Sequence, residues 1–491
     1  MRIEIQGDIN VSYVQNLCLI YFPGEKFGSE EQEENVLPCV HVSVQSDERG
    51  YAANVTLRTE EGKADAEYFF ENTVGYAPNK AAQLAVGGAF YAVGEKLFGY
   101  TPPWGILTGI RPAKIAEQFY SEMGTKTAVK KRMQQEYLLT PKKAQLVTDV
   151  AVRERKNLAK FGPDTCSLYV SIPFCPTRCA YCSFVSYATK RLLSMIPDYL
   201  ERLLRDIDEV ADVIAENGHQ ISTIYIGGGT PTTLDEKQLA KLLTKLAERF
   251  PAASLKEFTL EAGRPDTVTP EKLRIAKECG VTRVSINPQT LNEEVLRGIG
   301  RFHTVEQFYR GFEMARESGI PCINTDLIAG LPGDNFRSFA DTIDKIIAMR
   351  PENITVHTFC VKRSAELTHS GADIFSRSGD IATKSVDYSQ LMCMKSDYHP
   401  YYLYRQKNMA GNLENVGYTL NGFDGYYNSL IMAETHHIYA VGAGAVTKLL
   451  SKSGKIKRFY MPKYPYEYLD PVKGEELRRA FFNDLRTFDF S

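Results

Sequence analysis

The sequence predicts an α/β protein built around six successive strand–helix units, with a further α+β segment on each side. Two observations predict the central part. Short β-like runs alternate with amphipathic helical segments from Leu168 to about Val356, and polar or glycine-rich residues follow each run in turn. Units of this kind form parallel sheets with right-handed crossovers. A curled, incomplete barrel and an open doubly wound sheet both satisfy the periodicity.

The helices between these runs have readable boundaries. Pro197 begins a helix whose apolar residues recur with a 3.6-residue spacing. A second helix begins at Thr269-Pro270 and ends before Gly280, and a third begins with the capping-box pattern Thr304-Val-Glu-Gln307. The β-like runs are Leu168–Ser171, Ser222–Ile226, Glu257–Glu261, Thr282–Ile286, Cys322–Leu327 and Asn353–Val356.

The chain is long enough for two or three domains, since it has 491 residues. Within the N-terminal part, residues 1–22 are predicted to form strands and about Asn79 to Phe98 a helix, and the basic patch near Lys126–Arg132 is expected to be a solvated helix face. After about Phe359, strand-like and helix-like segments no longer alternate regularly. We place an α+β domain at 1–160, the strand–helix core at 161–360 and a substrate-covering domain at 361–491.

Composition limits the classes of function. The chain has 58 basic and 60 acidic side chains, so binding to nucleic acid or to an anionic membrane surface is not expected. Its start lacks the pattern of a signal peptide, and no apolar stretch approaches the roughly 20 residues of a membrane span. These features predict a cytoplasmic protein, in which clustered cysteines point to metal or redox chemistry.

Distinctive residues follow all six β-like runs. Ligands of parallel α/β folds bind beyond the carboxyl ends of the strands, so these residues are expected to share one site. In chain order they are the triplet Cys175, Cys179 and Cys182, the turn Gly227–Pro231, Glu261, Asn287–Gln289, Asp326 with Gly330–Pro332, and His357.

The cysteine triplet has the spacing Cys-x₃-Cys-x₂-Cys and can surround a metal centre with thiolates. Structural zinc normally takes four ligands, and no fourth Cys or His lies near in the sequence. A [4Fe–4S] cluster held by three thiolates would leave one iron open for an external ligand. Zinc and three incidental buried thiols are the alternatives, and the residues on the neighbouring strand ends favour the cluster.

The other rim residues are weak signals when taken singly. Gly227–Gly229 suit a tight turn as well as a backbone that a ligand approaches closely. Glu261, Gln289 and Asp326 suit helix caps as well as ligand contacts, and Arg301 suits a solvated helix end. Their shared position on one rim favours ligand contacts.

These motifs resemble those of radical S-adenosylmethionine (SAM) enzymes, and more narrowly the family of oxygen-independent coproporphyrinogen III oxidases (dehydrogenases). The resemblance covers Leu168 to about Lys448. It is carried by the cysteine motif with Tyr181, by the "GGGTPT" and "DLIAGLPG" stretches, and by the spacing of twelve positions from Gln289 to Arg301. The N-terminal stretch "WGILTGIRP", Trp104–Pro112, resembles the HemZ-type branch in particular.

The resemblance implies a fold and a set of roles. The core is expected to be a partial (βα)₆ TIM-like radical SAM barrel, with an N-terminal α+β domain and a C-terminal α+β extension. The three cysteines would hold the [4Fe–4S] cluster, whose free iron SAM chelates. The expected SAM contacts are Gly228, Gly229, Thr230 and Glu261 at the amino group, Arg301 at the carboxylate, Gln289 and Asp326 at the ribose, Tyr181 near the adenine, and Tyr169 on the SAM or substrate side.

The implied reaction is the oxidative decarboxylation of coproporphyrinogen III to protoporphyrinogen IX in haem biosynthesis, with an electron donor such as flavodoxin or ferredoxin. Two positions depart from the family pattern: Ser171 replaces a histidine, and Phe184 stands where the demonstrated dehydrogenases have a fourth cysteine. Relatives with Phe at that position include haem-binding chaperones. A haem-delivery protein that keeps the cluster, or a radical SAM enzyme acting on another tetrapyrrole, is therefore the alternative.

Overall fold

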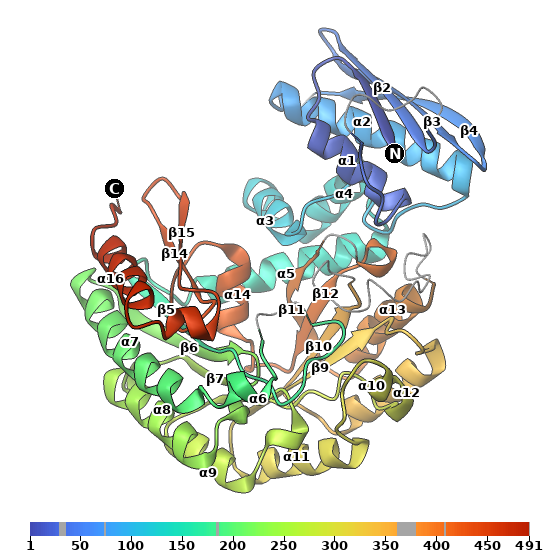
Figure 1. Ribbon diagram of the computed structural model, residues 1–491. Coiled ribbons are helices and arrows are strands. Elements are labelled where there is room, and N and C mark those ends of the chain that lie inside the picture. The colour runs from blue at the N-terminus through green and yellow to red at the C-terminus, as the bar shows by residue number, and fades with distance from the viewer. Residues whose placement is uncertain (29–35, 73–74, 183–185, 361–379, 407–408, 491) are drawn as a thin grey trace.

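The computed structural model describes residues 1–491 except 29–35, 73–74, 183–185, 361–379, 407–408 and 491 (Figure 1). Its strands form two sheets. The smaller has the order β1-β2-β3-β4, and the larger has eleven strands in the order β11-β12-β10-β9-β8-β7-β6-β5-β13-β14-β15. The larger sheet curls around the centre of the molecule, with helices along its outer side (Figure 1).

Six parallel strands, in chain order from β5 to β10, form the middle of the larger sheet. They are β5 Thr165–Ile172, β6 Gln220–Gly228, β7 Glu257–Glu261, β8 Arg283–Ser285, β9 Cys322–Ala329 and β10 Asn353–Thr358. The helices between them are α6 Lys190–Leu193, α7 Ile196–Glu216, α8 Glu236–Arg249, α9 Pro270–Glu278, α10 Glu293–Gly298, α11 Val305–Glu317 and α12 Phe336–Ala348. The partial (βα)₆ barrel is thereby confirmed, and the open doubly wound alternative falls away.

The helices follow the sequence signals because their apolar stripes face the sheet. Helix α7 buries Leu203, Ile207 and Val210 completely while its other face is exposed. The capping box predicted for α11 is present, since the Thr304 side chain accepts from the Gln307 N–H and the Gln307 side chain accepts from the Thr304 N–H.

The N-terminal sheet contains β1 Arg2–Gln6, β2 Cys39–Ser46, β3 Gly50–Thr59 and β4 Gly62–Glu71, with α1 Val11–Tyr21 and α2 Pro78–Phe98. The prediction of strands throughout residues 1–22 is wrong after Gln6. The Asn10 side chain accepts from the Tyr13 N–H and caps α1, and Val14, Leu17 and Cys18 then bury one helical face.

Three helices connect the N-terminal sheet to the barrel: α3 Pro112–Met123, α4 Lys126–Tyr137 and α5 Pro141–Leu158. In the predicted basic patch, Arg132 forms ion pairs with Glu122 and Glu136. The stretch before α3 is fixed to the C-terminal strands. Fully buried Trp104 donates its indole N–H to the Glu414 carboxylate at 2.6 Å, and Lys143 binds the same carboxylate at 2.7 Å.

The C-terminal segment extends the barrel sheet at both edges. Strands β11 His399–Tyr404 and β12 Asn415–Thr419 continue antiparallel beyond β10, whereas β13 His437–Val441 pairs parallel with β5 and leads into the hairpin β14 Val446–Leu450 and β15 Ile456–Tyr460. The helices of this segment are α13 Asp380–Lys395, α14 Tyr426–Ala433, α15 Pro465–Tyr468 and α16 Lys473–Arg486. The domain boundaries at about 160 and 360 stay a prediction, since the sheet runs through the second.

Short 3₁₀ turns complete the described elements: η1 Pro231–Thr233, η2 Ala252–Ser254, η3 Pro265–Thr267 and η5 Ala410–Asn412. No helix within the described ranges is both long and apolar enough to cross a membrane.

Candidate functional site

One cavity of about 580 Å³ lies at the carboxyl ends of the barrel strands, a size typical of ligand pockets. The structure brings all of the predicted site residues to its wall. These are Tyr169, Cys175, Cys179, Tyr181, Cys182, Gly228, Gly229, Thr230, Glu261, Gln289, Arg301 and Asp326. They lie on β5, β6, β7 and β9, in the stretches that follow β5, β6 and β8, and just after α10.

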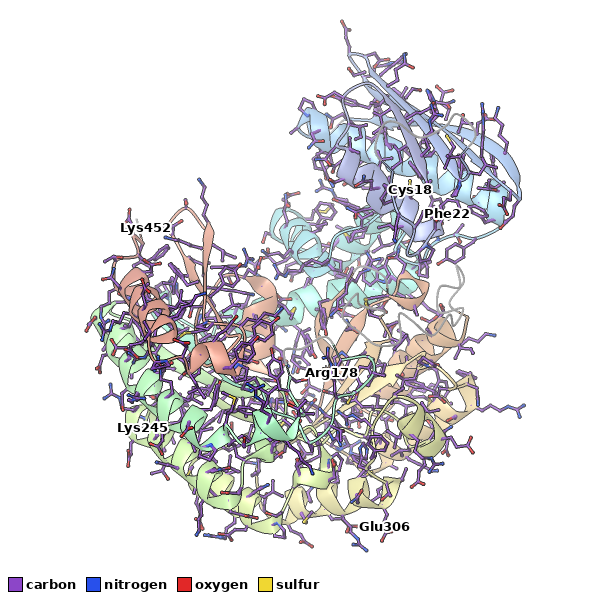
Figure 2. All side chains as sticks on the ribbon, viewed as in Figure 1. Cys18, Phe22, Arg178, Lys245, Glu306 and Lys452 are labelled. Atoms are coloured by element: carbon purple, nitrogen blue, oxygen red, sulfur yellow. The ribbon has the colours of Figure 1, made fainter. Side chains whose placement is uncertain are left out.

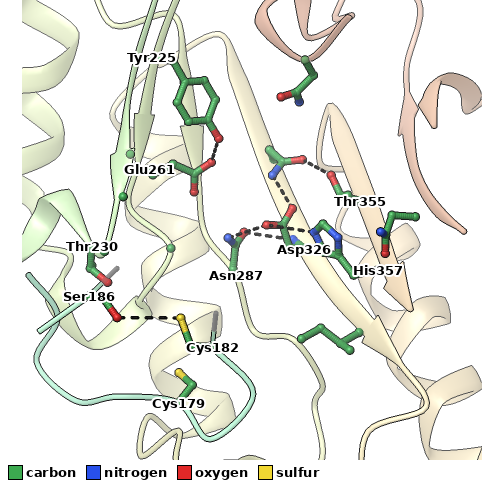
Figure 3. Close-up of a pocket in the computed structure, with 18 of the residues that line it drawn as sticks. Cys179, Cys182, Ser186, Tyr225, Thr230, Glu261, Asn287, Asp326, Thr355 and His357 are labelled. Carbon is green, nitrogen blue, oxygen red and sulfur yellow. Dashed lines mark hydrogen bonds and ion pairs between the residues drawn. The ribbon is translucent and has the colours of Figure 1, made fainter. Parts of the chain in front are cut away.

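The loop after β5 carries the three cysteines. Backbone hydrogen bonds shape it: the Cys175 N–H donates to the Tyr187 carbonyl at 3.0 Å, and the Cys182 N–H donates to the Cys179 carbonyl at 3.0 Å. The Ala180 N–H donates to the Ile299 carbonyl at 3.0 Å and ties the loop to the end of α10. The thiols of this loop are therefore held against the barrel rim (Figure 3).

The glycines after β6 pack against the same loop. A Cβ on Gly229 would lie 2.5 Å from the Phe174 carbonyl oxygen. The N–H groups of Gly229 and Thr230 donate to the carbonyls of Ile172 and Phe174, both at 2.7 Å. Gly228 has a φ of 107°, a conformation that side chains rarely adopt. The tight-turn interpretation of these glycines is thus correct.

The three thiols form a donor set that fits a cluster. All are free cysteines, with Cys175 Sγ 3.4 Å from the Thr230 hydroxyl and Cys182 Sγ 3.9 Å from the Ser186 hydroxyl. Within the described residues, no three His, Cys, Asp or Glu side chains converge closely enough for a single metal ion. An iron–sulfur cluster binds each cysteine through a different iron, so it suits thiols spread around a loop.

Two carboxylates, Glu261 and Asp326, dominate the electrostatics above this loop. Burial and the charge of Asp326 raise the pKa of Glu261 to about 7, although the Tyr225 hydroxyl donates a hydrogen bond to Glu261. Burial also opposes ionisation of Asp326, but His357 and Asn324 hold its pKa below the usual range. The environments thus push the two pKa values apart.

Asp326 is anchored by amide donors (Figure 3). Asn287 Nδ2 donates at 2.9 Å and Asn324 Nδ2 at 2.8 Å, and His357 Nε2 lies 3.7 Å away. Gln289 adopts a positive φ of 70°, and its N–H donates to the Asp326 carbonyl at 3.1 Å. Gln289 and Asp326 therefore lie side by side on the cavity wall, as two hydroxyl-binding groups would.

Arg301 is buried at the end of α10 instead of being a solvated cation. Its Nη1 donates to the carbonyls of Asn287 at 2.7 Å and Gly263 at 3.2 Å. The guanidinium faces Tyr181 and Cys179. Among the described residues, its buried Nε has no hydrogen-bond partner, so this side chain can still donate to an anion.

Sequence reasoning missed an aromatic cluster beside the carboxylates. The rings of Tyr225 and Tyr427 stack at 4.5 Å between centroids, and Tyr169 stacks on both at 6.1 and 6.3 Å. Tyr427 lies in the first turn of α14, where the N–H groups of Tyr426 and Tyr427 donate to the Glu257 carboxylate. The only available signal was Tyr225 two positions before the glycine turn, which places it on the same face of β6 as that turn.

The C-terminal segment closes the other side of the cavity with Asn428, Met432, Gly444 and Lys448. Ser171, the residue that departs from the family's histidine, donates its hydroxyl to the Ala443 carbonyl at 2.8 Å and ties β5 to this segment. Of the histidines that the structure describes, His357 lines the cavity. Phe184, the second departure, lies outside the described residues.

Comparison with known proteins agrees with this geometry. Residues 169–346 match the radical SAM superfamily. The chain is 32% identical over 477 residues to the oxygen-independent coproporphyrinogen-III oxidase-like protein HemZ of Bacillus subtilis (strain 168), covering 95% of each chain. It is also 38% identical over 198 residues to the heme chaperone HemW of the same organism, covering 40% of this chain and 51% of the chaperone.

Among solved structures, the coproporphyrinogen III oxidase HemN from Escherichia coli, described as a radical SAM enzyme, shares the fold. Its TM-score is 0.51 at 23% identity, over 66% of this chain and 72% of that one. The match with HemZ extends over nearly the whole of both chains and so includes the N-terminal region and the C-terminal strands. The chain therefore belongs to the radical SAM superfamily, in the family of HemZ-type coproporphyrinogen-III oxidase-like proteins, whose cofactors are a [4Fe–4S] cluster and SAM.

Proposed function

We propose that this protein catalyses the SAM-dependent oxidative decarboxylation of coproporphyrinogen III to protoporphyrinogen IX. The observation that carries the proposal is the similarity to a coproporphyrinogen-III oxidase-like protein over 95% of both chains. The reaction converts each of two propionate side chains into a vinyl group and CO₂: one hydrogen atom would pass to the 5′-deoxyadenosyl group released from SAM, and one electron to an external one-electron acceptor. The electron for each SAM cleavage comes from a small donor such as flavodoxin or ferredoxin.

The residues that line the cavity can be assigned the separate roles that this reaction requires. Cys175, Cys179 and Cys182 would hold the cluster, which would supply the electron for SAM cleavage. The ionised Glu261 and the carbonyls of the glycine turn bind the ammonium group of SAM, and Arg301 binds its carboxylate. The tyrosine cluster and the C-terminal segment then exclude water from the reacting carbon.

Asp326 and Gln289 orient the ribose by accepting hydrogen bonds from its hydroxyls. Asn287, Asn324 and His357 hold Asp326 in its ionised form, so it does not need to shed a proton when SAM enters. Tyr181, within the cysteine loop, faces Arg301 and would cover the adenine side.

A second function has one specific observation in its favour. Over 198 residues the chain is 38% identical to a heme chaperone, a higher identity than to the oxidase-like relative. A chaperone would keep the cluster and SAM but bind and deliver haem without decarboxylation.

An anaerobic assay separates the two functions. The reconstituted full-length protein is mixed with SAM, a low-potential reductant and coproporphyrinogen III, and vinyl products and CO₂ are measured. We expect both products together with methionine. SAM cleavage without vinyl product, accompanied by stoichiometric haem binding, would reject the decarboxylase and support the chaperone.

A further inference from the structure

Glu434, at the end of α14, is surrounded by three cations from two distant segments of the chain. It adopts a φ of 54° as the helix C-cap, and its side chain is only 11% exposed. Arg111, from the stretch before α3, forms an ion pair with it, and Lys114 lies 3.8 Å away. Arg458 of β15 binds the other carboxylate oxygen at 3.2 Å. One carboxylate thus faces three cations.

Lys448 adds a fourth cation on the cavity side of this cluster. It lies on β14 directly opposite Arg458 on β15, so both side chains project from the same face of the hairpin. Lys448 lines the cavity, whereas the three other cations lie behind it around Glu434. Burial, Arg111 and Arg458 lower the pKa of Lys448, and Glu434 opposes them.

The charge near Lys448 is not balanced by other groups. Glu154 also faces Arg111 and Lys114, but burial raises its pKa to about 7. The nearby Glu117 pairs with Arg155 at 3.1 Å. Among the described residues, the Lys448 ammonium has neither a hydrogen bond nor an ion pair within 4 Å.

The surroundings of Lys448 in the cavity are mainly apolar. The neighbouring wall residues from the same segment are Ile431, Met432, Ile438 and Val446. An unpaired ammonium beside apolar side chains, with two guanidinium groups behind it, favours an anionic group on an otherwise apolar ligand.

We propose that Lys448, supported by Arg111, Lys114 and Arg458 around Glu434, binds a carboxylate side chain of the tetrapyrrole in this cavity. The inference rests on the proposed function, since it takes the tetrapyrrole as the occupant. It also assigns a task to the stretch Trp104–Pro112: this stretch brings Arg111 to the substrate end of the barrel. The N-terminal region would then contribute charge to the site without touching the cluster.

The test is a binding titration on the reconstituted full-length protein under anaerobic conditions. The probes are coproporphyrin III, which carries four carboxylates and is fluorescent, and its uncharged tetramethyl ester. Lys448→Ala should weaken coproporphyrin III binding by about 10- to 100-fold, the range of one charge-assisted contact. Lys448→Arg should restore most of the affinity, and the ester should bind native protein and variants equally.

Lys457→Ala is the matched control, because Lys457 is exposed on the opposite face of the same hairpin. It should bind coproporphyrin III as the native protein does. Equal binding by Lys448→Ala, or no binding by the native protein, overturns the inference. Titration with haem, which also carries propionates, shows whether Lys448 serves that tetrapyrrole instead.

The two proposals can fail separately. If Lys448→Ala loses affinity for coproporphyrin III but the native protein forms no vinyl product, the carboxylate site stands and the decarboxylation fails. If the native protein decarboxylates and Lys448→Ala binds normally, the reaction stands and the carboxylate lies elsewhere.

Discussion

The Tyr225 hydroxyl donates a hydrogen bond to the Glu261 carboxylate, which links the ends of two adjacent strands, β6 and β7 (Figure 3). This contact stabilises the ionised form of Glu261 against the burial that raises its pKa to about 7. A cationic ligand needs that ionised form. The pair therefore makes the affinity for an ammonium group depend on pH in the neutral range.

We expect SAM to bind more tightly as the pH rises from 6 to 7, by up to about tenfold per pH unit, and to level off above 7. Below the Glu261 pKa, binding an ammonium must first release a proton. Without ligand the sign is opposite for folding: the native carboxyl holds its proton to higher pH than the unfolded one, so its contribution to stability falls between about pH 4.5 and 7.

Two variants check that Glu261 is the titrating group. Tyr225→Phe removes a donor to the ionised carboxylate and should move the SAM binding profile to higher pH. Glu261→Gln should weaken binding and flatten the profile. Isothermal titration calorimetry across this range measures both, and a flat profile in the native protein would contradict the assignment.

The cluster assignment makes a prediction about iron. Cys179→Ala removes one of three thiolates and should lose the cluster, the absorption of the reconstituted protein near 400 nm and all SAM cleavage. Cys166 lies buried on β5 outside the loop, so Cys166→Ala should retain all three. Iron and sulfide analysis provides the measurement, and normal iron in Cys179→Ala would refute the assignment.

Arg301 is expected to bind the SAM carboxylate. Arg301→Ala should weaken SAM binding by roughly 1.5–3 kcal/mol, the contribution of a hydrogen bond to a charged group. Because Arg301 also donates to two carbonyls, a thermal melt must accompany the titration. Arg301→Lys keeps the positive charge but lacks the planar guanidinium that can donate two hydrogen bonds to one carboxylate. It should therefore recover only part of the SAM affinity. Unchanged SAM affinity in Arg301→Ala would remove this role.

The position of the site could be predicted from the sequence because parallel strands end at a common edge. Cys175, Glu261 and Asp326 lie far apart in the chain, yet each lies at or near the carboxyl end of a parallel strand, so topology alone brings them to one cavity. The N-terminal cap of α11 at Thr304 could also be predicted, because its capping-box residues are close together in the sequence.

Contacts between distant segments could not be predicted in this way. Nothing in the local pattern around Lys448 indicates that β13 pairs with β5, and this pairing brings Lys448 to the cavity. The same holds for Arg111 and Glu434, which are more than 300 positions apart in the chain. In residues 1–22, charged and apolar residues fit both periodicities, and the Asn10 cap decided for a helix.

A substitution at Gly229 tests whether the cysteine loop needs a glycine at this position in order to pack. Gly229→Ala would place a Cβ 2.5 Å from the Phe174 carbonyl oxygen and so displace the start of the cysteine loop. We expect a lower iron content after reconstitution, because the thiols lose their arrangement. Gly298→Ala, whose Cβ would meet no atom within 4 Å, is the control and should bind iron normally. Full iron content in Gly229→Ala would show that the loop adapts.

The last prediction concerns how the N-terminal region is held to the barrel. Glu414 is fully buried and accepts from the Trp104 indole at 2.6 Å and from Lys143 at 2.7 Å, while Asp387 contacts Lys143 at 3.1 Å. Glu414→Ala leaves the buried ammonium without its closer partner and should destabilise the protein by about 3–5 kcal/mol. Glu271→Ala, which breaks an exposed ion pair with Arg274, should leave stability nearly unchanged. Chemical denaturation monitored by Trp104 fluorescence measures both, since this is the single tryptophan of the chain. Equal stability of the two variants would mean that apolar packing, and not this buried network, holds the stretch in place.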